Sequence, residues 1–265
     1  MKRILIPTDF SEFATYALEF AAFFAKRSGG TLCMVTVIKN KGEEAYQNAE
    51  QQLDEMRQLK DLKHVKVESV IRIGDSIRDE ILATAEEFKA DLIIMGSNGA
   101  SLIGEILLGS NTEKVIRKSN FSVLTIKHQI ITHRLDSIVF ASDFNDKNNK
   151  AFKVVRKLAQ LFNSKIYLLK INTPTRFEPT RLSLEKINAF IKAQQLEKFL
   201  KDKYEVALYA DTTEELGIMN YCIENEIDLI SLATQKRKAI WKFFNESTSQ
   251  NLLNHSFRPG LSVKN

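Results

Sequence analysis

The chain contains few of the residues that interrupt or cross-link a fold. Its 265 residues include four prolines, ten glycines and two cysteines, which leaves little room for long disordered linkers. No run of about 18 apolar residues is present, so we expect no membrane-spanning helix and no membrane partner. The apolar stretch at the N-terminus is too short for a secretion signal and runs directly into Asp9, so we expect a cytoplasmic protein.

Cysteine and histidine are too scattered to suggest cross-links or a metal site. Cys33 and Cys222 lie in apolar segments of different halves without a CxxC motif, which favours two buried thiols over a disulfide or a metal pair. The four histidines have no paired-ligand spacing. No metal site built from protein side chains is therefore predicted.

The composition is that of a globular protein of about two domains. Hydrophobic residues make up 44% and charged residues 27% of the sequence. Residues 1–130 contain 17 basic and 18 acidic residues, a net charge of −1, and residues 131–265 contain 21 and 15, a net charge of +6. The basic half would suit an anionic partner, but water-exposed lysine-rich helices explain the same excess. No nucleic-acid partner is predicted.

The sequence repeats itself once. The segment Ile4–Phe10, ILIPTDF, matches Ile138–Phe144, IVFASDF, at an offset of 134. Asp91–Met95 matches the segment DLISL at an offset of 137, and that offset continues without a gap to the last apolar segment of each half. Two matches at nearly equal offset predict a tandem duplication, with one domain over residues 1–130 and the other over 131–265.

Hydrophobic periodicity alternates between strand and helix within the first copy. The expected elements, starting with a strand and alternating, are Arg3–Thr8, Glu12–Ser28, Thr31–Ile38, Glu43–Leu59, Val65–Ile73, Ser76–Lys89, Asp91–Met95, Ser110–Lys118 and Ser122–Ile126. This order predicts an α/β protein with two tandem, doubly wound, parallel five-stranded sheets of Rossmann-like type. Ligands of such sheets bind beyond the carboxyl ends of the strands, where the strand order reverses.

Two segments of the first copy should meet at that edge. One is Pro7-Thr8-Asp9, at the end of the first strand. The other is the loop after the fourth strand, which starts at Gly96 and reads G-x2-G-x9-G-S. Its glycines, Gly96, Gly99 and Gly109, would let the backbone turn sharply and let N–H groups approach an anion.

The helix that follows this loop offers further donors at its positive end. These are the hydroxyl, amide and backbone N–H groups of Ser110, Asn111 and Thr112. A simple turn, and a capping box over Ser110–Glu113, would explain parts of the pattern without a ligand. The three-glycine spacing after the fourth strand is more specific, and it favours a phosphate site.

The first-strand segment, the MGSNG loop Met95–Gly99 and the pair Gly109-Ser110 together resemble the universal stress protein family, in its tandem form with two family domains in one chain. The resemblance covers nearly all residues and implies an adenine-nucleotide alpha-hydrolase-like fold. Family members with G-x2-G-x9-G-[ST] look like ATP binders. The resemblance therefore implies ATP in the first copy, with ADP and AMP as alternatives, and Mg²⁺ carried by the phosphates rather than by a protein cage.

The sheet topology and the resemblance together give twelve candidate contact positions for the nucleotide. Those at the first and second strands, near the adenine and ribose, are Pro7, Thr8, Asp9, Val37 and Ile38. Those along the phosphate loop are Met95, Gly96, Gly99, Gly109, Ser110, Asn111 and Thr112. Asp143 occupies the position of Asp9 in the second copy, so a role in the fold as a turn or cap residue stays open for Asp9.

The second copy lacks the loop glycines. Ala233, Lys236 and Glu246 stand at their positions, so side chains fill the cradle and Glu246 would repel a phosphate. No nucleotide is predicted there. The segment Lys236–Phe244 could contact an anion or a partner surface, although local packing of its aromatics, with its lysines facing water, is the favoured interpretation. The segment Asn172–Leu200 departs from the first copy and is a candidate cover for the second domain's empty pocket.

Three functions fit these observations. The first is a cytoplasmic stress-response or regulatory protein that binds ATP in its first copy. Its second copy would be structural or partner-binding and would pair with the first through their last strands, with a homodimer as a further option. The second is a slow ATPase or adenylyl-transfer enzyme. No Walker-type or SGG-x-DS loop is present, so no catalytic residue is predicted and at most weak hydrolysis is expected. The third is a protein-interaction module that ignores nucleotides.

Overall fold

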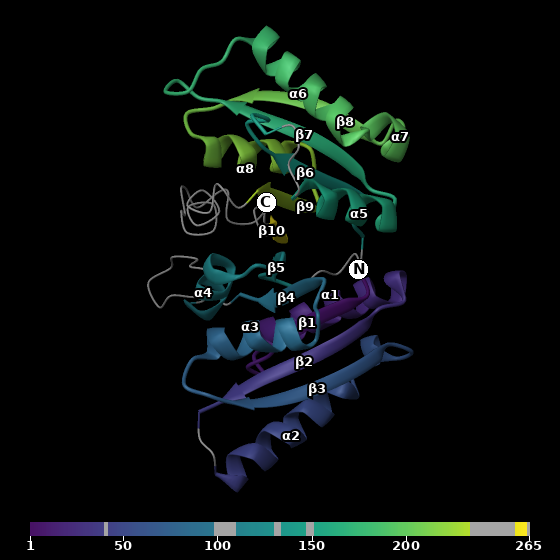
Figure 1. The fold of residues 1–265 in the computed structure, drawn as a ribbon, viewed down its shortest axis with the longest axis vertical. Helices are drawn as coiled ribbons and strands as arrows, with labels where there is room; N and C mark the ends of the chain where they lie inside the picture. The colour runs from purple at the N-terminus through teal and green to yellow at the C-terminus, as the bar shows by residue number, and fades with distance from the viewer. Residues whose placement is uncertain (40–41, 98–109, 130–133, 147–150, 234–257, 264–265) are drawn as a thin grey trace. The chain divides into compact units, whose positions relative to one another are not determined.

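The computed structural model describes residues 1–39, 42–97, 110–129, 134–146, 151–233 and 258–263. The chain forms two compact units, residues 1–133 and 134–265 (Figure 1). The boundary expected from the sequence, after residue 130, lies outside the described residues. Within the described part, no helix combines the length and apolar character needed to cross a bilayer.

The first unit alternates strands and helices. Its elements are β1 Arg3–Pro7, α1 Glu12–Ser28, β2 Thr31–Ile38, α2 Glu43–Arg57, a short 3₁₀ turn η1 Lys60–Leu62, β3 Lys66–Ile73, α3 Ile77–Glu87, β4 Leu92–Gly96, α4 Ser110–Lys118 and β5 Val123–Ile126. All nine elements predicted from periodicity are present, and their ends lie within two residues of the expected positions.

The described residues of the second unit repeat this order, with a short helix where the first unit has η1. Its elements are β6 Ser137–Ala141, α5 Phe152–Phe162, β7 Lys165–Asn172, α6 Thr180–Gln194, α7 Leu196–Leu200, β8 Tyr204–Ala210, α8 Glu214–Glu224, β9 Leu229–Ala233 and β10 Gly260–Val263. Residues 234–257, between β9 and β10, lie outside the described residues. The short helix α7 follows Gln195, whose φ of 52° ends α6.

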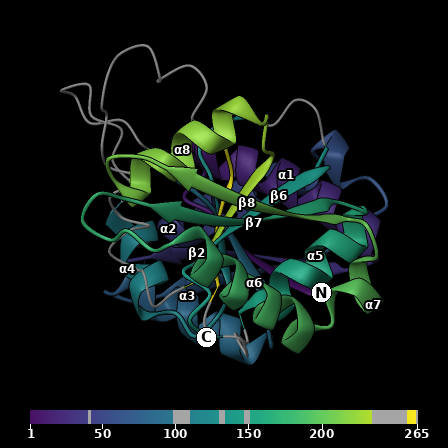
Figure 2. The ribbon, with the colours of Figure 1, turned by 90° about the horizontal axis from the view of Figure 1, so that it is seen from above.

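Both sheets are parallel and doubly wound, as the sequence predicts. The strand order is β3-β2-β1-β4-β5 in the first unit and β10-β9-β6-β7-β8 in the second. The order reverses between β1 and β4, and between β9 and β6. Because parallel crossovers are right-handed, this reversal places the helices on both faces of the sheet. Figure 2 shows α8 on one side of β7 and β8, with α5 and α6 on the other.

The first helix of each unit ends in the same backbone conformation. α1 ends at Gly29 (φ 59°, ψ 38°), whose N–H donates to the Ala25 carbonyl. α5 ends at Asn163 (φ 62°, ψ 31°), whose N–H donates to the Ala159 carbonyl. Glycine and asparagine adopt this left-handed conformation most readily. Gly29 and Asn163 are 134 positions apart, and so are Ala25 and Ala159. The repeat in the sequence is therefore also a repeat of backbone geometry.

A carboxylate fixes the start of the central strand in each unit. Oδ2 of Asp91 accepts hydrogen bonds from the N–H groups of residues 2 and 3, at 2.6 and 3.1 Å. Oδ2 of Asp228 accepts the equivalent bonds from residues 136 and 137, at 2.8 and 3.0 Å. Asp91 and Asp228 are 137 positions apart, so the residues related by this offset make the same contact in both units.

The core of the second unit contains a cluster of phenylalanines beneath α6. Phe190 of α6 packs against Phe152 of α5 with ring centroids 4.9 Å apart, and against Phe144 at 5.2 Å. Phe140 of β6 lies 5.0 Å from Phe152, and all four rings are almost fully buried. This cluster attaches α6 to the sheet.

We expect Gly29→Ala to lower the free energy of unfolding by about 1 kcal/mol, because alanine is strained in the left-handed conformation. A Cβ at this position would meet only the Lys2 ammonium, at 3.4 Å, so the cost is conformational rather than steric. Urea unfolding measures the change. Asn163→Gly, at the equivalent cap, is the control and should cause no loss. An unchanged midpoint for Gly29→Ala would contradict the assignment of the cap.

Phe190→Ala should destabilise the second unit by about 3–5 kcal/mol, because it removes a large buried ring from a packed cluster. The matched control is Phe177→Ala, since the Phe177 side chain is 74% exposed, and its effect should stay within about 0.5 kcal/mol. Thermal unfolding followed by circular dichroism compares the two variants. Equal effects would show that the cluster does not hold α6.

Candidate functional site

A cavity of about 110 Å³ lies at the carboxyl ends of β1, β2 and β4 in the first unit. β1 and β4 are the neighbours at which the strand order reverses, the position where parallel α/β sheets bind their ligands. The beginnings of α1, α3 and α4 complete the lining. The cavity therefore lies where the topology predicts a site.

Eight of the twelve predicted site residues line this cavity. They are Pro7, Thr8, Asp9, Val37, Met95, Gly96, Asn111 and Thr112. Ile38, the last residue of β2, is partly exposed and is not among the lining residues. Ser110 is the first residue of α4, and Gly99 and Gly109 lie outside the described residues. The strand ends and the first turn of α4 thus come together, while the loop glycines remain a prediction.

The turn after β1 fixes Asp9 beside the cavity. Phe10 has a φ of 63°, and its N–H donates to the Thr8 hydroxyl at 3.0 Å. Oδ1 of Asp9 accepts hydrogen bonds from the N–H and the hydroxyl of Ser11, at 3.1 and 2.6 Å. The Ser11 hydroxyl in turn accepts the Ala14 N–H at the start of α1. Asp9 is therefore oriented by the turn before any ligand arrives.

The second unit repeats this turn. Phe144 has a φ of 55°, its N–H donates to the Ser142 hydroxyl at 3.1 Å, and Oδ1 of Asp143 accepts the Asn145 N–H at 3.3 Å. An aspartate at this position thus serves the fold in both units, which bears out the turn role left open for Asp9. Contact of Asp9 with a ligand remains a prediction.

Gly96 is explained by packing against α1. A Cβ on Gly96 would lie 2.3 Å from the Phe13 carbonyl oxygen and 2.7 Å from the Ala14 nitrogen, and its φ lies outside the left-handed region. The close approach of a helix is therefore one reason for this glycine, and its expected approach to an anion remains a prediction. The second unit has Ala233 at this position, and its helix α5 begins only at Phe152.

The first turn of α4 is tied to the end of β4. The Thr112 side chain is buried, and its hydroxyl donates to the Gly96 carbonyl at 3.1 Å. A hydroxyl that donates inward offers a ligand only its lone pairs, so Thr112 positions the helix rather than donating to a phosphate. Asn111 is exposed and lines the cavity beside it. Asn111 and the N–H groups of this helix start are therefore the better candidates for anion contact.

Five lining residues were missed by sequence reasoning. They are Ala14, Val35, Thr36, Ile77 and Ile81. Ile77 and Ile81, four residues apart, share one face of the helix expected over Ser76–Lys89, and helical periodicity alone does not show which residues of an apolar face reach the edge of the sheet. Thr36 is 3% exposed. A polar residue inside an otherwise apolar strand was the sequence signal that could have marked Thr36 as a site residue.

The cysteines and metal-ligating residues form no competing site in the described residues. Cys33 and Cys222 are free and buried, as predicted. Burial raises the pKa of the Cys33 thiol to about 11, and it also raises the pKa of Cys222. No group of three or more histidine, cysteine, aspartate or glutamate side chains is placed to hold a metal ion in this part of the chain.

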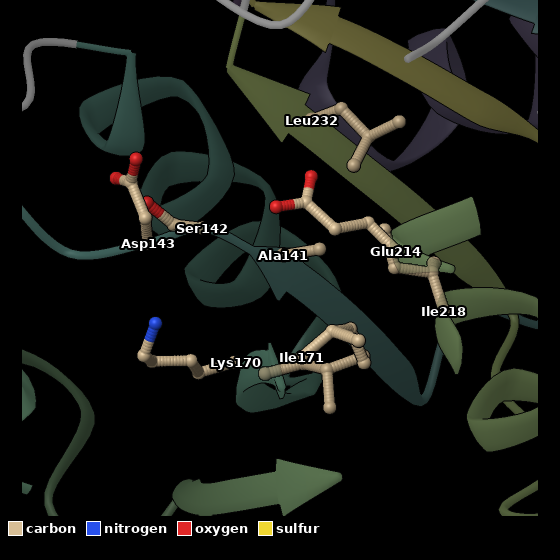
Figure 3. Close-up of a pocket in the computed structure, with 9 residues that line it drawn as sticks. Ala141, Ser142, Asp143, Lys170, Ile171, Glu214, Ile218 and Leu232 are labelled. Atoms are coloured by element: carbon tan, nitrogen blue, oxygen red, sulfur yellow. The ribbon is translucent and has the colours of Figure 1, made fainter. Parts of the chain in front are cut away.

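The second unit has its own, smaller cavity at the equivalent edge. Its volume is about 30 Å³, and it is formed by the ends of β6, β7 and β9 and the start of α8 (Figure 3). A volume of this size holds about one water molecule. The two units therefore share the location of a cavity but differ in its size.

Comparison with known proteins places both halves in one family. The model of the universal stress protein family matches residues 1–127 and again residues 135–264. Universal stress protein MJ0577 of Methanocaldococcus jannaschii is 35% identical over an alignment of 156 positions. The alignment covers 48% of this chain and 96% of that protein. Universal stress protein Slr1230 of Synechocystis is 24% identical over an alignment of 300 positions, which covers the full length of both chains.

A solved structure shows the same fold over the whole chain. The crystal structure of a universal stress protein from Archaeoglobus fulgidus has a TM-score of 0.78 at 20% identity, and covers 99% of this chain and 98% of its own. The family match in each half agrees with the repeat and with the two parallel sheets. The chain therefore belongs to the universal stress protein family, with two family domains in tandem.

Proposed function

We propose that this protein is a cytoplasmic stress-response or regulatory protein that binds an adenine nucleotide, first of all ATP, in its first unit. The second unit takes no nucleotide and has a structural or partner-binding role. The observation that carries the proposal is the cavity between the ends of β1 and β4. Eight of the residues predicted from the sequence to contact the nucleotide line it.

The cavity suits the base end of a nucleotide. Its walls include the apolar side chains of Val35, Val37, Ile77 and Ile81, which can pack against the faces of a flat, neutral ring. Its volume of about 110 Å³ is below the roughly 300–1,000 Å³ of sites that enclose a whole ligand. It therefore accounts for the base, with the sugar and phosphates extending toward the start of α4.

The polar groups around the cavity suit the sugar and phosphates. Asp9 presents a carboxylate that the turn has already oriented, which can accept hydrogen bonds from ribose hydroxyls. Asn111 and the N–H groups at the start of α4 can donate to phosphate oxygens. The glycine loop would complete the phosphate contacts, and Mg²⁺ would be carried by the phosphates.

Pairing of the two units through their last strands, and a homodimer of whole chains, remain predictions from the sequence. A closed pair of sheets would remove two exposed edges.

We expect one ATP per chain by isothermal titration calorimetry. Gly109→Glu, which introduces the residue that the second copy has at this position, should weaken binding roughly tenfold or more, since it sets a carboxylate beside the phosphates. Glu246→Gln in the second copy is the control and should leave the titration unchanged. Two bound nucleotides per chain, or a chain that binds none, would contradict the proposal.

The duplicated turn provides a matched test of Asp9. Asp9→Ala and Asp143→Ala remove the equivalent turn contacts, so their effects on stability should be similar. Only Asp9→Ala should weaken ATP binding, by roughly 10- to 100-fold, the usual range for losing a hydrogen bond to a charged group. Calorimetry with both variants measures this difference. Equal affinities would restrict Asp9 to its role in the turn.

A further inference from the structure

The two cavities are equivalent residue by residue. Each of the nine residues that line the second cavity lies one repeat offset from a residue that lines the first. The offset is 134 for the ends of β6 and β7, and 137 for α8 and β9. Seven of the nine pairs keep the kind of side chain, such as Asp9 with Asp143 and Ile81 with Ile218. The wall of the site was therefore largely retained when its volume was lost.

Two positions change from neutral to charged. Lys170 replaces Thr36 on the second strand of the unit, and Glu214 replaces Ile77 at the start of the helix. Figure 3 shows both charged ends turned toward the side of the pocket where Asp143 lies. The Lys170 side chain is only 8% exposed, so its four-carbon stem occupies space that the smaller threonine leaves open.

Both new charges are paired with the same loop. Nζ of Lys170 lies 3.4 Å from Oε2 of Glu178, and Arg176 donates to Oε1 of Glu214 at 3.3 Å. The loop, residues 173–179, has seven residues between β7 and α6, whereas residues 39–42 make four between β2 and α2. The first unit therefore has neither the longer loop nor the two charged residues that pair with it.

Further contacts hold this loop in place. The Asn172 amide donates to the Glu178 carbonyl at 3.0 Å and its oxygen accepts the Glu178 N–H at 3.3 Å. The Glu178 carboxylate also accepts from the Ser183 hydroxyl at 2.9 Å and from the Lys186 ammonium, both in α6. A base entering the second cavity would have to displace the Lys170 side chain, 8% exposed, from the carboxylate of Glu178, whose side chain is 18% exposed. Separating an ion pair that is largely withdrawn from water is costly.

We propose that Lys170 and Glu214 exclude the nucleotide base from the second unit, independently of the missing glycines, and that Thr36 and Ile77 admit it to the first. The inference rests on the proposed function, since it names the residues that decide which unit takes the nucleotide. Both charges are already paired with the loop, so a base that entered would separate them from these partners and reduce their contact with water, which costs free energy. Restoring the glycines alone would therefore leave the second unit without a nucleotide.

Adenosine separates the base pocket from the phosphate loop because it carries no phosphate. Methyl-labelled full-length protein reports on both cavities in one NMR spectrum through Ile81 and Ile218. Adenosine should shift the Ile81 signal of the wild type and leave Ile218 unchanged. In the double variant Lys170→Thr/Glu214→Ile it should shift both.

The double variant is designed to keep the fold. Glu178 retains Lys186 and Ser183 as partners, and the Arg176 side chain, 73% exposed, remains in water. If Ile81 shifts in the double variant but Ile218 does not, the inference is wrong and the proposed function stands. If Ile81 does not shift in the wild type and ATP does not bind, the proposed function is wrong. A crystal structure of the double variant then decides the inference. A second cavity that keeps its present small volume overturns it, and one that grows toward the volume of the first cavity supports it.

The reverse exchange tests the same residues in the first unit. Thr36→Lys and Ile77→Glu should each weaken adenosine and ATP binding roughly tenfold or more. Tyr46→Lys, at an exposed position of α2, is the control for added positive charge. Unchanged or tighter ATP binding by Thr36→Lys would contradict the inference. Such a result would mean that the new lysine leaves the base pocket open and only attracts the phosphates.

Discussion

Parallel pairing of the central strand is the constraint from which the rest of this structure follows. β1 pairs with β2 on one side and with β4 on the other, all in the same direction. Their carboxyl ends therefore meet at one edge, and the helices that follow β3 and β4 begin there too. The eight predicted contact residues that line the cavity all reach it from this edge. Changes along the rest of the sheet affect the fold without changing the chemistry of the site.

The duplication separates the residues that maintain this fold from those that serve a ligand. The left-handed helix cap, the aspartate that holds the start of the central strand and the aspartate turn after that strand all occur in both units. Among the residues that line the two cavities, two positions change from neutral to charged: an ion-paired lysine and a glutamate in one unit stand where a threonine and an isoleucine stand in the other. A copy that keeps its fold while its pocket closes is well suited to a structural or partner-binding role.

The sequence predicted the architecture and much of the candidate site, for a physical reason. Apolar periodicity is strong in the first copy, so all its elements were found, and strand ends are fixed once the strands are known. Side-chain direction was harder to predict. Ile77 lies in the same stripe as core residues, and only the placement of α3 shows that it reaches the cavity. The inward hydrogen bond of Thr112 and the contact of Gly96 with α1 depend on how helices approach the sheet, which a sequence motif does not encode.

The central claim is that one unit of the pair admits a nucleotide and the other does not. A crystal structure of the full chain grown with ATP and Mg²⁺ tests it most directly. The account predicts density for the base between the ends of β1, β2 and β4, with phosphates toward the start of α4, and no nucleotide at the ends of β6, β7 and β9. An empty first cavity, or a nucleotide held in the second unit, would contradict it.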